Sequence, residues 1–253
     1  MAPEKIPLTR NKNKEQRINR ILSLAGLVSR RGADELIRSG RVMLNGQTIR
    51  EPGAKGIWGE DSIRVDGKEI PEPSVRTYLM LNKPFGYICS LTDPEGRPIV
   101  TDLIKDLKTR VYPVGRLDFD SLGLLLLTND GDFSYRLTHP RYRVPRTYKV
   151  TVKGSVNQEA LRILRRGVQL EDGFSGSAKA DLIRQSGGKS TIRLTVTLGR
   201  KRMVRRMMES IGYQTVHLIR TGFGNLELGT LKMGRYRHLE LDEISGLKRM
   251  AGL

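Results

Sequence analysis

A leucine-rich run at residues 122–127, within the stretch GRLDFDSLGLLLLTNDG, is bounded on both sides by turn-forming residues. A short apolar run of this kind is typical of a strand that is buried in a sheet. Two aspartates, Asp118 and Asp120, stand just ahead of the run. The sequence therefore predicts two carboxylates at the start of a buried strand, where Leu117 and the leucines provide a rigid and partly dry surrounding.

The overall charge makes those carboxylates unexpected. The chain of 253 residues has 45 Lys+Arg and 27 Asp+Glu, a formal net charge of +18. Clustered basic residues bind a phosphate backbone by releasing its counterions, so nucleic acid is the leading partner, ahead of anionic lipid or a merely solvated basic surface. A carboxylate repels phosphate and is costly to desolvate, and it therefore needs a structural or a chemical reason.

Length and composition limit the classes of protein to which the chain can belong. The chain is long enough for one large domain or two unequal ones. Its apolar stretches are all far shorter than the ~20 residues of a membrane helix, and its N-terminus is polar and basic, so we expect neither a secretory signal nor a membrane partner. A single cysteine, Cys89, excludes an internal disulfide framework and fits a reducing cytoplasm.

Changes in composition divide the chain into four predicted parts. Residues 1–15 are expected to form a flexible basic arm, and residues 16–73 a small module. The proline-bearing stretch PEPSVRTY contains a linker at about residues 74–76. A larger domain is predicted over residues 77–253.

The small module is predicted to contain two helices followed by hairpins. Apolar residues recur at helical spacing over residues 18–25, and Ser29 is a suitable N-cap for a second short helix. Asn45-Gly46 and Asp66-Gly67 are each flanked by alternating apolar and polar residues, which is the strongest short hairpin signal.

The larger domain combines few helices with many strands. TYLMLNKP, RTYKVTVKG and STIRLTVTLG are strand-like, and helices are expected at about 130–138, 157–166 and 201–212. The lack of a regular βαβ rhythm favours an α+β fold around a mixed or antiparallel sheet. In the last helix, an apolar face opposes a basic one that carries Arg202, Arg205 and Arg206.

Several familiar chemistries lack the residues they need. The three histidines, His139, His217 and His238, do not have metal-ligand spacing, so no metal site is predicted. The stretch GFGNLE lacks the third glycine of a dinucleotide loop and no Walker-type loop is present, so no cofactor is predicted. Cys89 is either a small buried residue or a nucleophile.

Two readings are open for the acids ahead of the leucine strand. Each would cap backbone N–H groups in a turn, and this is the preferred reading for Asp120. Asp118 would instead be kept ionised by a cationic partner, for which the basic face of the 201–212 helix is a ready source.

The small module resembles the S4 RNA-binding domain. The similarity is carried by RINRILSLAGLVSRRGADELIRSGRVMLNG and by the closing DSIRVDG, over about residues 16–68. It implies that four basic residues face RNA, although each could equally be an ordinary solvated helix charge: Arg30, Arg31, Arg38 and Arg41.

The larger domain resembles the bacterial ribosomal RNA pseudouridine synthases of the RsuA/RluB type. Beside GRLDFDSLGLLLLTNDG, the similarity rests on LNKPFGYICSLTDPEGRPIVTDLI, RTYKV and LGRKRMVRRMMESIG, and with the S4-like module it covers about residues 16–240. It implies isomerisation of a uridine in RNA to pseudouridine, without metal or cofactor. The base has to be flipped out of its stack for this reaction.

The resemblance also implies roles for single residues. Asp118 falls on the catalytic aspartate, which attacks the ribose or the uracil. Tyr148 falls on the tyrosine that stacks on the target base, Arg205 on the basic residue that pairs with the aspartate, and Arg116 on a residue that assists extrusion of the base. Two further arginines of the same helix are predicted to contact RNA, namely Arg202 and Arg206.

The motif departs from the family pattern at two positions. Met203 stands where glutamine is common, and Ser121 where threonine is common. Neither change removes a catalytic role, although Met203 would loosen a hydrogen bond near the site.

The resemblance also indicates a partner for the protein, and one alternative function stays open. The expected partner is ribosomal RNA or an assembling ribosomal subunit, with the large subunit favoured and transfer RNA left open. The protein is expected to act as a monomer in the cytoplasm. The alternative is a non-catalytic S4-type RNA-binding or ribosome-assembly factor, in which Asp118 is only a turn residue.

Overall fold

The computed structural model describes residues 15–71 and 75–253, which form two compact units. One unit comprises the N-terminal residues up to Thr77 together with Lys108–Arg110, and the other comprises Tyr78–Leu107 and Val111–Leu253. Apart from Glu15, the predicted arm lies outside the described residues, as does the first residue of the predicted linker, Ser74.

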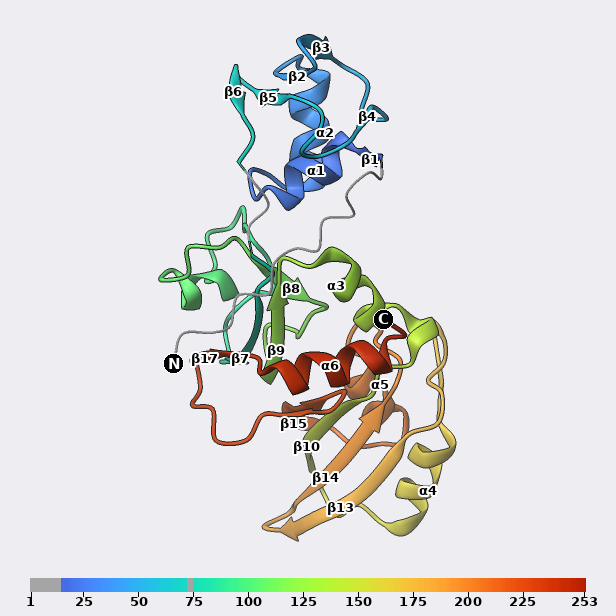
Figure 1. Ribbon diagram of the computed structural model, residues 1–253. Helices are drawn as coiled ribbons and strands as arrows, with labels where there is room; N and C mark the ends of the chain where they lie inside the picture. Colours follow the sequence, from blue (N-terminus) through green and yellow to red (C-terminus); the bar gives the residue numbers. More distant parts are fainter. Residues whose placement is uncertain (1–14, 72–74) are drawn as a thin grey trace. The chain divides into compact units, whose positions relative to one another are not determined.

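The N-terminal unit packs two helices against short strands (Figure 1). Its hairpin turns are as predicted, because Asn45 and Asp66 adopt positive φ angles of 50° and 51° ahead of their glycines. Its core is one apolar cluster around Ile18, Ile37 and Ile63. The elements are β1 (Gln16–Arg17), α1 (Ile18–Leu24), α2 (Arg30–Arg38), β2 (Val42–Leu44), β3 (Gln47–Ile49), β4 (Lys55–Gly56), β5 (Ile63–Val65) and β6 (Lys68–Glu69).

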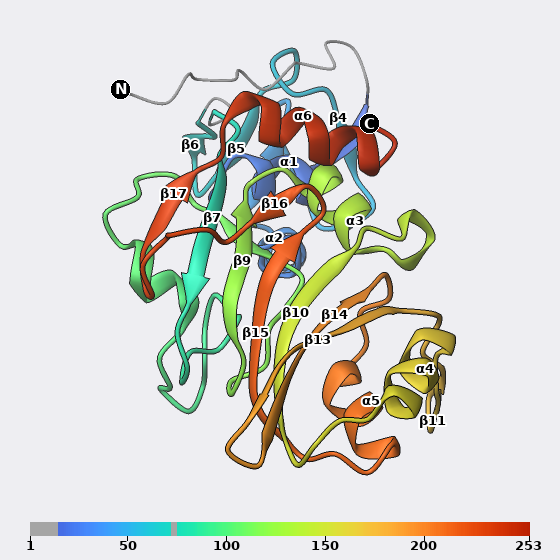
Figure 2. The same cartoon turned by 90° about the horizontal axis from the view of Figure 1, so that it is seen from below.

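The second unit is built on one mixed sheet in the order β13-β14-β10-β15-β9-β7-β17, as Figure 2 shows. β16 pairs with β15 and β8 pairs with β9; the β9–β15 pairing is parallel and the other pairings are antiparallel. The predicted α+β fold with a mixed sheet is confirmed. The strands are β7 (Tyr78–Lys83), β8 (Tyr112–Val114), β9 (Leu122–Thr128), β10 (Arg146–Lys153), β11 (Gln169–Leu170), β12 (Gly173–Phe174), β13 (Lys179–Ser186), β14 (Lys189–Val196), β15 (Thr215–Phe223), β16 (Leu226–Glu227) and β17 (Tyr236–His238).

The three predicted helices of this unit are present, and their sequence signals act as expected. Asp130 and Asn157 cap α3 and α4 by accepting hydrogen bonds from backbone N–H groups in the first turn. A fourth helix, α6, was not predicted; its polar composition and internal glycine weaken the helical pattern. The helices are α3 (Gly131–Thr138), α4 (Gln158–Arg166), α5 (Met203–Ser210) and α6 (Leu241–Met250), with 3₁₀ turns at Val100–Ile104 and Pro140–Tyr142.

The leucine-rich strand β9 lies inside the sheet, between β7 and β15, and its residues from Gly123 to Thr128 are all buried. Leu125 and Leu127 belong to the same apolar cluster as the buried faces of α4 and α5. In the described part of the chain, no helix is long and apolar enough to cross a membrane.

One row of paired residues runs across four adjacent strands of the sheet, β7, β9, β15 and β10. Lys83 of β7 pairs with Gly123 of β9, Gly123 with Arg220 of β15, and Arg220 with Tyr148 of β10. A Cβ atom added to Gly123 would lie 2.2 Å from the Arg220 carbonyl oxygen, and the φ angle of Gly123 is +100°. Only glycine therefore permits β9 and β15 to approach so closely.

Substituting Gly123 tests this close approach. We expect Gly123→Ala to destabilise the fold by about 2–5 kcal/mol, because it combines an unfavourable φ angle with a backbone clash. The matched control is Gly212→Ala, whose φ is +85° but whose added Cβ meets nothing within 4 Å. The control should cost only about 1–2 kcal/mol. Urea unfolding of both variants measures the difference, and equal losses would contradict the role given to Gly123.

Candidate active site

A cavity of about 230 Å³ opens beside the start of β9. Its walls come from the loop that leads into β9, from β10 and β15, and from the segment that leads into α5. Among the described residues that line it, Asp118 is the only acid, whereas the basic side chains are Arg116, Arg146, Arg200, Lys201, Arg202 and Arg220. The cavity therefore has a strong excess of positive charge around one carboxylate.

Asp118 is held in place by its backbone. Its carbonyl oxygen accepts a hydrogen bond of 3.0 Å from the Ser121 amide, which closes a turn just before β9. The next residue, Phe119, accepts at its carbonyl oxygen a hydrogen bond of 3.0 Å from the Gly86 amide. Within residues 15–71 and 75–253, no hydrogen bond or ion pair engages the Asp118 carboxylate. The acid is thus fixed in position while its oxygens are available for a ligand.

The predicted ion pair between Arg205 and Asp118 is wrong in this structure, because Arg205 pairs with Asp120. Arg205 Nη2 lies 3.1 Å from Asp120 Oδ2 and donates a hydrogen bond of 3.0 Å to the Asp120 carbonyl oxygen. Arg202 adds a second ion pair, with Nη1 3.3 Å from Asp120 Oδ2. Asp120 is therefore more than a turn residue, since it ties the Asp118 turn to the α5 helix.

Arg205 is buried although it belongs to the basic face of the helix. The sequence predicts that face to lie opposite the apolar one, and the residue is only 6% exposed. Its neighbours Met203 and Val204 are buried as well, at 3% and 5% exposed. The preceding residue, Arg202, has a positive φ of 50° and stands at the N-terminus of α5. Arg205 contacts the acidic turn through the carboxylate and the carbonyl oxygen of Asp120, and these contacts replace solvent around its guanidinium.

Lys83 is a part of the site that the sequence did not reveal. Its side chain is 0% exposed, and Nζ donates hydrogen bonds of 2.8 Å to the Ser121 carbonyl oxygen and 3.0 Å to that of Pro84. Burial lowers the pKa of Lys83, while the nearby Cys89, Asp120 and Asp118 oppose that shift. The only signal was a lysine at the end of the buried strand YLMLNK.

Cys89 supports the same turn from the other side. Its Sγ accepts a hydrogen bond of 3.3 Å from the Leu117 amide, next to Asp118. Burial raises the pKa of the Cys89 thiol, which favours the protonated and unreactive form. This geometry favours the structural reading of Cys89 over a nucleophile.

Two buried arginines, Arg146 and Arg220, form the inner wall of the cavity and were also missed. Arg146 donates to the carbonyl oxygens of Thr197 at 3.2 Å and Leu137 at 3.1 Å, and burial lowers its pKa. Arg220 Nε donates to the Leu124 carbonyl oxygen at 2.6 Å. A charged residue in a strand is normally taken to face solvent, so the sequence pattern concealed both arginines.

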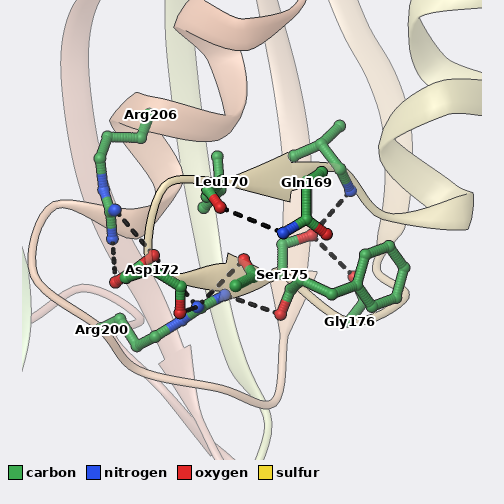
Figure 3. A network of polar contacts seen from close by, with 10 residues as sticks. Gln169, Leu170, Asp172, Ser175, Gly176, Arg200 and Arg206 are labelled. Carbon is green, nitrogen blue, oxygen red and sulfur yellow. Dashed lines mark hydrogen bonds and ion pairs between the residues drawn. The ribbon is translucent and has the colours of Figure 1, made fainter.

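Arg200 and Arg206 meet at Asp172, in the hairpin of β11 and β12 (Figure 3). Arg206 forms two hydrogen bonds of 2.8 Å to the Asp172 carboxylate and holds its pKa below the usual range. Arg200 Nη1 lies 3.1 Å from Asp172 Oδ1 and also donates to backbone carbonyl oxygens of the hairpin. Arg206 thus has an intramolecular partner, and its contact with RNA stays a prediction.

The remaining predicted residues are placed as follows. Tyr148 of β10 is 9% exposed and lines the cavity with Asp118, and the exposed Arg116 lines the same cavity. In the N-terminal unit, Arg41 forms a two-pronged ion pair with Asp66, at 2.8 and 2.6 Å. The other predicted RNA contacts are exposed on α2, and their role stays a prediction: Arg30, Arg31 and Arg38.

The Arg205–Asp120 pair yields a stability prediction. A double-mutant cycle with Arg205→Met and Asp120→Asn should give a coupling free energy of about 1–2 kcal/mol, below that of a fully buried pair because the Asp120 side chain is 34% exposed. The control cycle uses Arg206→Met and Asp172→Asn, a more exposed pair between the same helix and the β11–β12 hairpin, and should give a smaller coupling. Denaturant unfolding measures both, and a coupling near zero for the first pair would contradict its role.

Comparisons with known proteins identify the family of the chain. Residues 77–210 match the family model described as RNA pseudouridylate synthase, and residues 16–55 match that of the S4 domain. The chain is 43% identical to a ribosomal large subunit pseudouridine synthase B of Bacillus subtilis, covering 93% of this chain and 97% of that protein. It is 41% identical to an RNA pseudouridine synthase of Aquifex aeolicus, covering 94% and 96%.

Among solved structures, a crystal structure of a pseudouridylate synthase superposes with a TM-score of 0.66 at 30% identity, covering 91% of this chain and 99% of that one. The match of the family model spans more than half of the sequence, and the relatives match over nearly all of it. The chain belongs to the RNA pseudouridylate synthase family and carries an S4 domain in front of the catalytic one.

Proposed function

We propose that this enzyme isomerises a uridine of ribosomal RNA, in the large subunit, to pseudouridine, and that Asp118 is its nucleophile. The observation that carries the proposal is a single carboxylate in a cavity whose other charged side chains, among the described residues, are five arginines and one lysine. The choice of RNA is supported by the similarity to the Bacillus subtilis relative, which is named a ribosomal large subunit pseudouridine synthase.

The charge distribution suits a flipped nucleotide. A nucleotide that leaves its stack brings its phosphates with it, and the cationic walls attract them while Tyr148 offers an aromatic face to the base. Arg116 stands at the same cavity and would help to hold the base outside its stack. These contacts offset the free energy of unstacking, which is about a few kcal/mol.

The reaction exchanges one bond to the ribose for another. The N1–C1′ bond breaks, the uracil turns, a C5–C1′ bond forms, C5 loses a proton and N1 gains one, so the product is an isomer. Asp118 would attack C1′ to form an ester or add to C6 of the uracil, and each route needs an ionised carboxylate.

The pairing of Asp120 supports the role given to Asp118. An arginine bound tightly to a carboxylate lowers its nucleophilicity and blocks one of its faces. Asp120 engages both Arg205 and Arg202, so these two cations position the turn and leave the oxygens of Asp118 for the substrate. The two acids of the motif thus have separate tasks, one structural and one chemical.

The S4 domain is proposed to dock the RNA. Its helix α2 presents exposed arginines, and such side chains bind phosphates without reading sequence. The target would be ribosomal RNA, free or in an assembling subunit, and we propose that a monomer in the cytoplasm performs the reaction.

Replacing Asp118 tests the catalytic assignment. We expect Asp118→Asn to lower pseudouridine formation about 1,000-fold or more, because the amide is a very weak nucleophile. RNA affinity should stay the same or rise, since a negative charge is removed from a cationic cavity. The measurement is a time course on large-subunit ribosomal RNA, with mapping of the modified uridine.

The matched control is Asp242→Asn, an exposed acid at the start of α6. It should retain the activity of the unchanged protein. Substantial pseudouridine formation by Asp118→Asn would end the assignment, and no formation by the unchanged enzyme would end the proposed choice of RNA.

The docking role of the S4 domain predicts a change in salt dependence. The double variant Arg30→Gln/Arg31→Gln should bind RNA more weakly, and the slope of log affinity against log salt should fall by about 0.7 for each lost phosphate contact. The single-turnover rate at saturating enzyme should be unchanged. The control Arg162→Gln/Arg166→Gln removes the same charge from exposed positions on α4, and an equal loss there would point to net charge alone.

A further inference from the structure

Arg220 carries a buried charge that the fold does not neutralise. The residue is 2% exposed, and of its nitrogens Nε donates to the Leu124 carbonyl oxygen. Its Nη2 is buried without a hydrogen-bond partner, and in the described part of the chain no carboxylate forms an ion pair with it. A guanidinium is always charged, so burial without a counterion is unfavourable. The Phe223 ring, whose centroid lies 5.4 Å from Arg220 Cζ, offsets part of this cost, and a ligand would supply a further partner.

The position of Arg220 identifies where that ligand would be. Arg220 lines the cavity together with Asp118, and in the sheet it pairs directly with Tyr148, the residue proposed to stack on the base. Ser121 lines the same cavity, is 1% exposed, and has an Oγ without a hydrogen-bond partner. Arg220 and Ser121, which come from different elements, therefore both line the cavity in which the uracil would lie, and each has a buried polar atom without a hydrogen-bond partner in the described part of the chain.

The chemistry of the base explains what these groups would bind. When the N1–C1′ bond breaks, its electron pair stays with the uracil, which becomes an anion with charge on N1, O2 and O4. If Asp118 adds to C6 first, the electron pair of the C5–C6 double bond moves to C5 and O4. Along either route a carbonyl oxygen of the uracil becomes negative before C5 bonds to C1′.

Because of the symmetry of the uracil ring, a fixed hydrogen-bond donor can bind a carbonyl oxygen of the base both before and after the base turns. A half-turn about the N3–C6 axis exchanges N1 with C5, which the reaction requires, and exchanges O2 with O4 as well. A donor held rigidly by the sheet would therefore meet a carbonyl oxygen both before and after the base turns. Arg220 is held in this way, by its Nε contact and by the close approach of β15 to Gly123.

We propose that Arg220 donates a hydrogen bond from Nη2 to a carbonyl oxygen of the target uracil and stabilises the negative charge of the base, with Ser121 Oγ as a second hydrogen-bonding group. This inference rests on the proposed function. Stabilisation of developing charge by a donor fixed in advance accelerates the chemical step more than it strengthens binding.

Sulfur substitution in the RNA tests the contact at the level of single atoms. The substrates are a synthetic RNA that spans the mapped uridine, with uridine, 2-thiouridine or 4-thiouridine at that position. Sulfur accepts hydrogen bonds weakly, so it should slow the unchanged enzyme wherever Arg220 donates. Single-turnover rates at saturating enzyme are compared for the unchanged protein, Arg220→Met and Arg220→Lys, and thermal unfolding checks that each variant is folded.

We expect Arg220→Met to lower the rate constant about 100-fold on uridine while RNA affinity changes little. At least one thio substitution should slow the unchanged enzyme and have no further effect on the variant. If Arg220→Met fails to fold, Arg220→Lys, which keeps the charge, is used in the same comparison. The control Arg165→Met, an exposed residue outside the cavity, should behave as the unchanged enzyme.

Two outcomes would overturn the proposal. The first is that each thio substitution slows the Arg220 variants by the same factor as it slows the unchanged enzyme. This result would show that Arg220 does not contact the carbonyl oxygens. A loss confined to RNA affinity, with an unchanged rate at saturation, would show that Arg220 binds phosphate instead. In both cases the unchanged enzyme still forms pseudouridine through Asp118, so these outcomes differ from a failure of the proposed function.

Discussion

The approach of β15 to β9 at Gly123 is the constraint on which the catalytic unit depends. The two strands run parallel and pair at only two registered positions, Ile219 with Leu122 and Arg220 with Gly123. Because Gly123 has no side chain, the backbone of Arg220 packs directly on it. The strand that begins with the Asp118 turn and the strand that carries a buried arginine are thereby locked together, and the cavity lies beside this junction.

Most of the charged side chains described around the junction have a partner within the protein, whereas the Asp118 carboxylate does not. Lys83 is hydrogen-bonded to backbone carbonyl oxygens, Arg205 and Arg202 to Asp120, and Arg206 to Asp172. These interactions fix loops and the α5 helix at modest cost because each cation has a partner. In the described part of the chain the Asp118 carboxylate has no such contact, and Arg220 has one hydrogen bond, from Nε to the Leu124 carbonyl oxygen; both residues line the cavity. A substrate that carries phosphates and develops charge on its base complements both.

The sequence alone predicts those features of the fold that interactions between residues near in the chain determine. The caps at Asp130 and Asn157, the hairpin turns and the buried leucine strand were all predictable, because a side chain and its near neighbours decide them. The partner of Arg205 was not, since two acids are close together in one segment and three arginines in a distant one, and only tertiary packing selects the pair. Arg220 escaped notice because a strand pattern treats a charged residue as solvent-facing.

The row of residues from Lys83 to Tyr148 has a consequence for the order of folding. Its strands are β7, β9, β15 and β10, so neighbours in the sheet come from distant parts of the chain. Strands that are far apart in the sequence pair slowly, because the intervening chain must lose conformational entropy before the stabilising contacts form. During synthesis, β9 has no partner on the β15 side until residue 220 has left the ribosome. An exposed leucine strand at that stage is a site for aggregation, and the polar residues at both of its ends limit that risk.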